Sequence, residues 1–123
     1  MRADCTRIWT DDEGETHFVV ASHPLELADF APPAPPLGVS AVQAAADVRF
    51  IGAPAGWDSP PHPAPRRQLV VMLRGLCEAT TSDGEIRLFV PGDVVLLEDT
   101  SGAGHRTRVP GDESWLALVV VLD

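Results

Sequence analysis

Proline and glycine divide the sequence into short apolar segments, and this spacing constrains the fold more than any other feature. The 123 residues include 12 prolines and 10 glycines. Two stretches, APPAPPLG (residues 31–38) and GAPAGWDSPPHPAP (residues 52–65), can continue neither a helix nor a central strand. The segments between the turns are rich in Val and Leu, and their lengths are typical of strands. We therefore expect an all-β domain with little helix.

The expected strands follow from these runs. One further segment, residues 41–47, is Ala-rich and could be helix or strand. The Asp83-Gly84 pair predicts a hairpin with a tight primed turn. The nine predicted strands are residues 17–21, 39–43, 48–51, 68–73, 76–80, 85–90, 94–97, 105–109 and 115–122.

Charge and cysteine content exclude several classes of partner. The formal net charge is −9, and all nine basic residues are Arg. Nucleic acid and anionic membrane surfaces require a basic surface, so we expect neither as a partner. No signal peptide is recognisable, and Cys5 and Cys77 lack a CxxC spacing, so a cytoplasmic protein with two free thiols is predicted. A single disulfide is the alternative.

Alternate residues around the second proline-rich stretch form a candidate ligand site. On an unbroken strand, side chains two residues apart share a face. His62, Arg66 and Gln68 would then point in the same direction, with Ala64 between them. A guanidinium in such a place can clamp a carboxylate or phosphate, so Arg66 is the expected anchor of an anionic ligand. A solvated Arg66, paired with an acidic side chain, is the alternative.

This stretch resembles the first sequence motif of the cupin superfamily. That motif contains a Gly, a His-x-His pair, a Glu and a second Gly at fixed distances. Here Gly56, His62 and Gly75 match it. Ala64 stands in place of the second His, and Gln68 stands in place of the Glu.

The stretch PGDVVLLEDTSGAGH (residues 91–105) resembles the second cupin motif through Gly92, Asp93 and His105. The resemblance, which extends to a group of small bacterial cupins, implies a double-stranded β-helix (jelly-roll) barrel over residues 39–123. Residues 1–38 would supply an N-terminal strand and a proline-rich connector that packs on the barrel. The resemblance also implies a homodimer formed by edge-to-edge pairing.

The two departures from the motif bear on metal binding. A metal-dependent cupin holds its ion with three imidazoles and one carboxylate. Here His62, His105 and the neutral amide of Gln68 remain, and an amide oxygen poorly replaces an anionic ligand. We therefore favour a site without a cofactor. A divalent transition metal held by His62, Gln68 and His105 is the alternative.

The predicted function is a metal-independent enzyme of isomerase, cyclase or dehydratase type that acts on a polar or anionic small molecule. His62 and His105 are the candidate acid and base. Arg66 and Gln68 would bind the ligand, and Trp57 would cover the mouth of the site or anchor its loop. Two alternatives stay open: a cupin oxygenase or related enzyme dependent on Fe, Ni, Cu or Zn, and a non-catalytic ligand-binding or sensing module.

Overall fold

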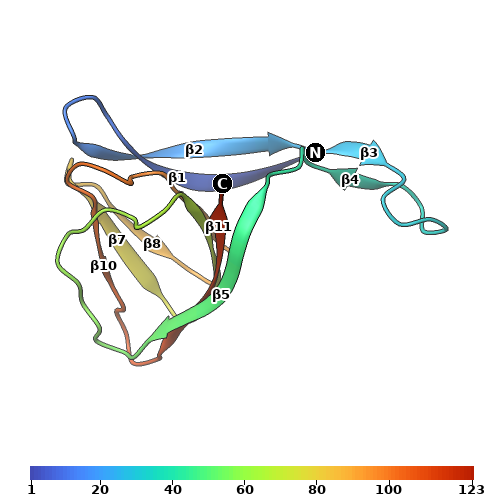
Figure 1. Cartoon of the computed structure of the whole chain (residues 1–123). Coiled ribbons are helices and arrows are strands. Elements are labelled where there is room, and N and C mark those ends of the chain that lie inside the picture. Colours follow the sequence, from blue (N-terminus) through green and yellow to red (C-terminus); the bar gives the residue numbers. More distant parts are fainter.

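The computed structural model describes all 123 residues and contains eleven strands and no helix (Figure 1). The all-β prediction is therefore confirmed. No helix is present that could cross a membrane. The strands are β1 (Arg2–Thr10), β2 (Thr16–Pro24), β3 (Glu26–Ala28), β4 (Leu37–Val39), β5 (Ala45–Ala53), β6 (Gln68–Arg74), β7 (Cys77–Thr81), β8 (Ile86–Phe89), β9 (Val94–Leu97), β10 (His105–Arg108) and β11 (Trp115–Leu122).

Two sheets face each other and form the body of the molecule (Figure 1). The larger has six strands in the order β2-β1-β9-β6-β11-β5, and the smaller has three in the order β10-β7-β8. Neighbouring strands are antiparallel except for the parallel pair β1 and β9. The strand hydrogen bonds do not join the two sheets into one closed barrel.

The hydrophobic core lies between the sheets because side chains alternate along each strand. On β11 the buried positions are Trp115, Ala117, Val119 and Val121. The N-terminal strands also contribute to this core, since Ile8 on β1 and Phe18 on β2 belong to the same buried cluster. Residues 2–24 are thus part of the sheet, and the expected domain boundary at residue 38 lies within β4.

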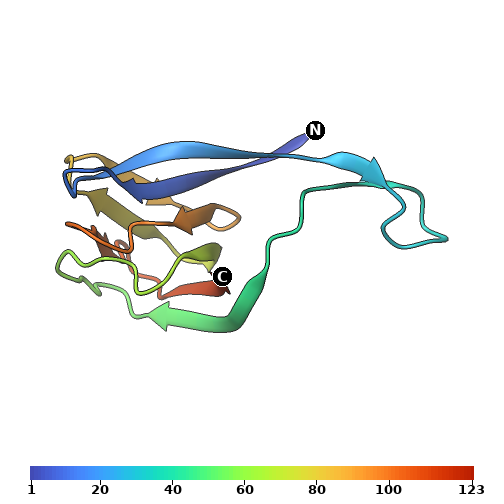
Figure 2. The ribbon, with the colours of Figure 1, turned by 45° about the horizontal axis from the view of Figure 1, so that its top comes forward.

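Residues 25–44, which we call the arm, extend away from the two sheets (Figures 1 and 2). The arm carries the short hairpin of β3 and β4. Its apolar side chains are open to solvent, with exposed fractions of 77% for Leu27, 67% for Phe30 and 95% for Val42. The strand predicted over residues 39–43 is wrong, because β4 ends at Val39 and residues 40–44 form no ladder.

Turn geometry follows the glycines. The β7–β8 hairpin forms as predicted, but its turn is not a primed one, because Gly84 has a φ of 90° and no residue other than glycine has a positive φ.

The strand expected over residues 17–21 is longer at both ends in β2. Strand β1 was not among the predicted strands, because in its sequence RADCTRIWT the residues typical of strands follow a polar and charged start.

Candidate functional site

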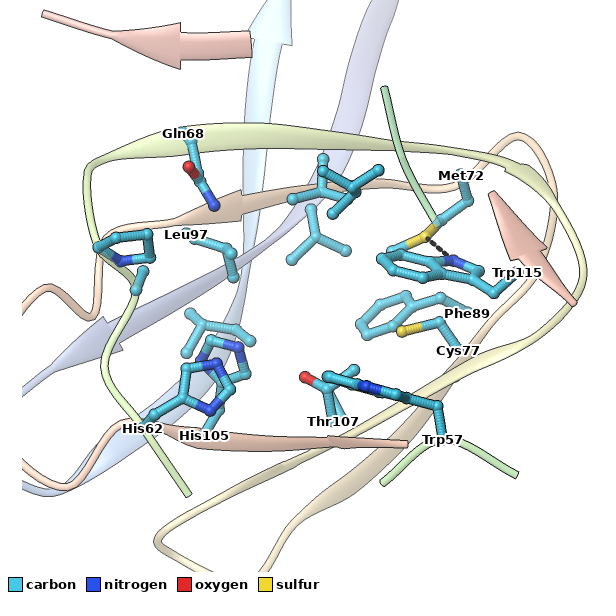
Figure 3. A pocket seen from close by; sticks show the side chains of 17 residues that line it. Trp57, His62, Gln68, Met72, Cys77, Phe89, Leu97, His105, Thr107 and Trp115 are labelled. Carbon is cyan, nitrogen blue, oxygen red and sulfur yellow. Dashed lines mark hydrogen bonds between the residues drawn. The ribbon is translucent and has the colours of Figure 1, made fainter. Parts of the chain in front are cut away.

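A cavity of about 150 Å³ lies between the two sheets (Figure 3). Twelve of its 17 lining residues are hydrophobic, and they come from both sheets and from the proline-rich loop between β5 and β6. His62, His105 and Gln68 lie toward one end of the cavity, and Thr107 lies beside Trp57 (Figure 3). A mainly apolar cavity with a few converging polar groups is typical of a small-molecule site.

The proline-rich loop places His62 beside His105. The loop runs antiparallel to β10, and the backbone N–H of each histidine donates to the carbonyl of the other over 3.0 Å. Paired residues of this kind point to the same side. The two ring centroids are 5.3 Å apart, and both rings line the cavity.

This close approach depends on Gly104, which immediately precedes β10. Its φ is +71°, and a Cβ atom at this position would lie 2.2 Å from the carbonyl carbon of His62. No side chain fits there without displacing the loop. Gly104 therefore holds the two histidines together through its small size.

The ring of His105 is oriented by a buried carboxylate. Its Nδ1 lies 2.6 Å from Oδ2 of Asp99, which is fully buried, while His105 itself is 6% exposed. A carboxylate only accepts here, so Nδ1 carries the donated proton and Nε2 is left for a ligand. The other carboxylate oxygen, Oδ1, is buried and has no hydrogen-bond partner in the protein. This carboxylate therefore has one partner only, the imidazole.

The ring of His62 is oriented differently. Its Nδ1 donates to the carbonyl oxygen of Pro60 over 3.0 Å, so its Nε2 is also free of protein partners. His62 is an exposed residue at the mouth, whereas His105 is buried deeper. The site thus presents two free Nε2 atoms. They belong to rings with different partners at Nδ1, a backbone carbonyl for His62 and a carboxylate for His105.

Gln68 and Thr107 complete the polar end. Gln68, at the start of β6, lies on the wall opposite the two histidines (Figure 3). Thr107 shares the parity of His105 on β10, and its hydroxyl has no hydrogen-bond partner in the protein. The sequence pattern brings Gln68 to the site, but nothing in it distinguishes Thr107 or Asp99 as functional.

The opposite end is apolar and aromatic. Phe89 and Trp115 are buried there, and the indole N–H of Trp115 donates to the sulfur of Met72 over 3.3 Å. Trp57 also lines the cavity and is 40% exposed, so it lies at the boundary with solvent. The indole of Trp57 and the ring of Phe89 face the same space (Figure 3).

The expectation that Arg66 points into the cavity is wrong. Its side chain is 51% exposed and forms an ion pair with Asp47 over 3.1 Å. The chain bends over residues 65–67, which breaks the alternation on which the expectation depended. Pro65 lines the cavity instead, so no guanidinium reaches the site.

The polar side chains of the site supply two imidazoles and a neutral amide but no anionic ligand, which is the type of donor that hard divalent ions prefer. Cys77 also lines the cavity, but burial raises the pKa of its thiol to about 12, so it is not a thiolate. Both cysteines are free, as predicted.

The one cluster of potential metal ligands lies elsewhere, at the turn between β1 and β2. Ligand atoms of Asp11, Glu15 and His17 lie within 4.8 Å of one another. Both ring nitrogens of His17 are already used, by Asp11 over 2.7 Å and by Asp83 over 3.0 Å. This cluster is an ion-pair network that connects two turns.

Comparison with solved structures supports a cupin fold. A Cupin 2 conserved barrel domain protein from Salinispora arenicola matches with a TM-score of 0.53 and 26% sequence identity, over 80% of this chain and 73% of that protein. A conserved protein of unknown function from Streptococcus pyogenes matches at 22% identity and a TM-score of 0.49, over 62% of each chain. No family model and no curated protein matches the sequence.

Proposed function

We propose that this chain is a small-molecule-binding cupin that catalyses proton transfer without a metal ion. The observation that carries the proposal is the pair of cavity-facing imidazoles, His62 and His105, each with a free Nε2 and a different partner at Nδ1. An isomerase, cyclase or dehydratase needs an acid and a base placed on the same bound molecule. Two histidines beside one small cavity meet that need.

The two partners assign the roles. Asp99 stabilises positive charge on the ring of His105, so we assign His105 as the acid that gives a proton to the ligand from Nε2. His62 has only a carbonyl at Nδ1, so we assign it as the base that accepts a proton at Nε2. Gln68 on the opposite wall would orient the polar group of the ligand between them. Asp99 acts through His105 and is a positioning residue.

The ligand that we propose differs from the one expected from the sequence. Without Arg66, the cavity has no permanent cation to bind a phosphate or a strongly charged anion. The polar groups at one end favour a molecule with one or two polar substituents and an otherwise apolar body. The proposal is thus narrowed from polar or anionic molecules in general to compact, largely apolar ones.

A test of proton transfer does not require the substrate to be known. A metabolite extract would be incubated in deuterium oxide with the wild-type protein or with the variant His62→Gln/His105→Gln. The proposal expects at least one small molecule to gain deuterium or to change its structure with the wild type and not with the variant. Identical extracts in both cases would contradict catalysis and favour a non-catalytic binding or sensing module.

Metal analysis tests the other alternative. The proposal expects far less than one equivalent of Fe, Ni, Cu or Zn in protein purified without an affinity tag. One equivalent that is lost on His62→Ala and on His105→Ala would instead support a metal-dependent oxygenase or a related enzyme with His62, Gln68 and His105 as ligands.

We further infer that the two sheets correspond to the double-stranded β-helix of cupins. The match to the Salinispora arenicola barrel and the pairing of the loop with β10, which extends the smaller sheet, support this inference. Two free cysteines are consistent with a reducing compartment, and we propose the cytoplasm.

We also propose a homodimer in which the arm of each copy packs on its partner. The arm exposes Leu27 and Phe30, and the outer face of β5, an edge strand, exposes Val48 and Phe50. One chain therefore carries both an extended apolar segment and an uncovered apolar face. In a dimer with a two-fold axis, the arm of each copy would cover the apolar face of the other, since a symmetric interface is self-complementary.

A further inference from the structure

The geometry points to a single-ring aromatic molecule with one polar substituent as the ligand of the cavity. This inference rests on the proposed function, because it names the substrate class of the same site. Three observations carry it: the size of the cavity, the aromatic side chains at one end and the grouping of hydrogen-bonding atoms at the other.

The volume limits the ligand to about one ring. The cavity measures about 150 Å³. An engineered protein cavity of roughly this volume accommodates benzene. A nucleotide, a bicyclic cofactor or a long acyl chain is too large to be enclosed in this space. A ring with a hydroxyl, carbonyl or carboxyl group fits, and the exposure of both His62 and Trp57 shows that the cavity reaches solvent.

The walls favour an aromatic body. Trp57, Phe89 and Trp115 all line the cavity, and they surround its apolar end (Figure 3). Aromatic pairs prefer offset or edge-to-face contacts, which contribute beyond the burial of apolar area. An aromatic ring can make such contacts with side chains on several sides. An aliphatic ring of the same size cannot, because it is puckered and has no π-system.

The polar end limits the substituents. His62, His105 and Gln68 offer their hydrogen-bonding groups to one end of the cavity, and Thr107 lies between the histidines and Trp57 (Figure 3). A sugar carries hydroxyls around its whole ring, so several would be buried against apolar walls without a partner. A ligand with a single oxygen substituent that points toward His62 and His105 would have no polar atom of its own left without a hydrogen-bond partner.

This orientation also places the reacting atoms. For a ligand whose carbonyl group is joined to the ring through a benzylic carbon, the carbonyl oxygen would accept a hydrogen bond from Nε2 of His105, and the benzylic carbon would face Nε2 of His62. His62 would take the benzylic proton while His105 gives its Nε2 proton to the carbonyl oxygen, which converts the keto form into the enol without any change in oxidation state. The atoms balance within the ligand and the two imidazoles.

Matched pairs of probes test this class. Binding of phenol and benzoate would be measured by calorimetry against cyclohexanol and cyclohexanecarboxylate, with D-ribose as a polyol. We expect each aromatic probe to bind at least about fivefold more tightly than its cyclohexane counterpart, in line with the energy of aromatic contacts. Trp57→Ala should weaken phenol binding by a similar factor. Trp9→Phe is the control, because Trp9 packs on His17 and does not line the cavity.

Equal or tighter binding of the cyclohexane probes, or of D-ribose, would overturn the aromatic assignment, and so would the absence of phenol and benzoate binding. Imidazole NMR signals separate this outcome from failure of the proposed function. If D-ribose binds and shifts the signals of His62 and His105, the acid–base site stands and the aromatic class is wrong. If phenol binds without affecting either histidine, the aromatic class stands and the acid–base proposal fails.

Discussion

Two imidazole rings carry the proposed chemistry, and the acceptor at each Nδ1 distinguishes them. His105 donates to a buried carboxylate and His62 donates to a carbonyl. Replacing the acceptor at Nδ1 should therefore change the rate of proton transfer without preventing the ligand from binding. Single substitutions can test this, because Asp99 does not line the cavity and Arg66 points away from it.

The substitution Asp99→Asn should slow proton transfer much more than it weakens binding. The amide keeps the shape of the side chain but removes the negative charge that stabilises a protonated His105. General acid–base catalysis contributes about 10²–10⁴-fold, so we expect deuterium incorporation to fall by about 100-fold or more. Phenol affinity, measured by calorimetry, should change less than about threefold, because Asp99 does not line the cavity and the phenol hydroxyl can donate to an unprotonated Nε2 of His105. A parallel loss of affinity and rate would indicate a structural role instead.

Arg66 and Gln68 form a matched pair for testing the side-chain directions. Arg66→Ala removes an exposed ion pair, which contributes about 0–1 kcal/mol to stability, and should leave phenol affinity unchanged. Gln68→Ala removes a hydrogen-bonding group of the cavity wall and should weaken phenol binding by roughly fivefold to tenfold. Calorimetry on both variants would show which of the two side chains contacts the ligand. Weaker phenol binding to Arg66→Ala alone would mean that the Arg66 side chain points into the cavity, as expected from the sequence.

Strands are predicted best where the segment is a continuous run of apolar residues between turns. The segments 94–97 and 115–122 match β9 and β11 residue for residue. Strand β1 was missed because its first residues are polar and charged and its apolar residues do not form a continuous run. The direction of Arg66 could not be predicted, because a bend of three residues between the loop and β6 changes which side chains face inward. Local periodicity contains no information about such a bend.

The ion-pair network around His17 predicts a pH-dependent contribution to stability. The hydrogen bond to Asp11 raises the pKa of His17, and the hydrogen bond to Asp83 acts in the same direction. Folding therefore favours the protonated ring. Its stabilising effect is complete below the unfolded pKa of about 6.5 and is lost as the pH rises through the higher pKa of the folded state.

Thermal unfolding of His17→Gln should show this directly. We expect the variant to have a lower Tm than the wild type near pH 6, and the difference should shrink as the pH rises toward about 9. Both carboxylates are ionised throughout this range, because their pKa values lie below the usual value for Asp. A difference that stays constant or grows with pH would contradict the network.

The whole molecule combines a body of two facing sheets with an arm that extends away from that body (Figure 2). Such a shape exposes apolar side chains that a partner can cover. With a net charge of −9, the surface would keep an assembled dimer soluble.

Light scattering on the intact protein tests the proposed dimer. We expect twice the chain mass for the wild type and the single-chain mass for Phe30→Asp, since a charge in an apolar interface is not tolerated. Phe30→Leu keeps the position apolar and should remain dimeric. Because Phe30 is 67% exposed in the single chain, neither change should unfold the sheets, and circular dichroism would verify this. A monomeric wild type would contradict the dimer.

The most direct measurement of the central claim is the electron density within the cavity in a crystal grown with phenol and without added metal. The proposed site predicts a planar molecule beside Trp57 and Trp115, with its oxygen within hydrogen-bond distance of Nε2 of His62 or His105. A metal ion bonded to both imidazoles at about 2.0–2.1 Å would contradict it. So would a cavity filled by its own side chains.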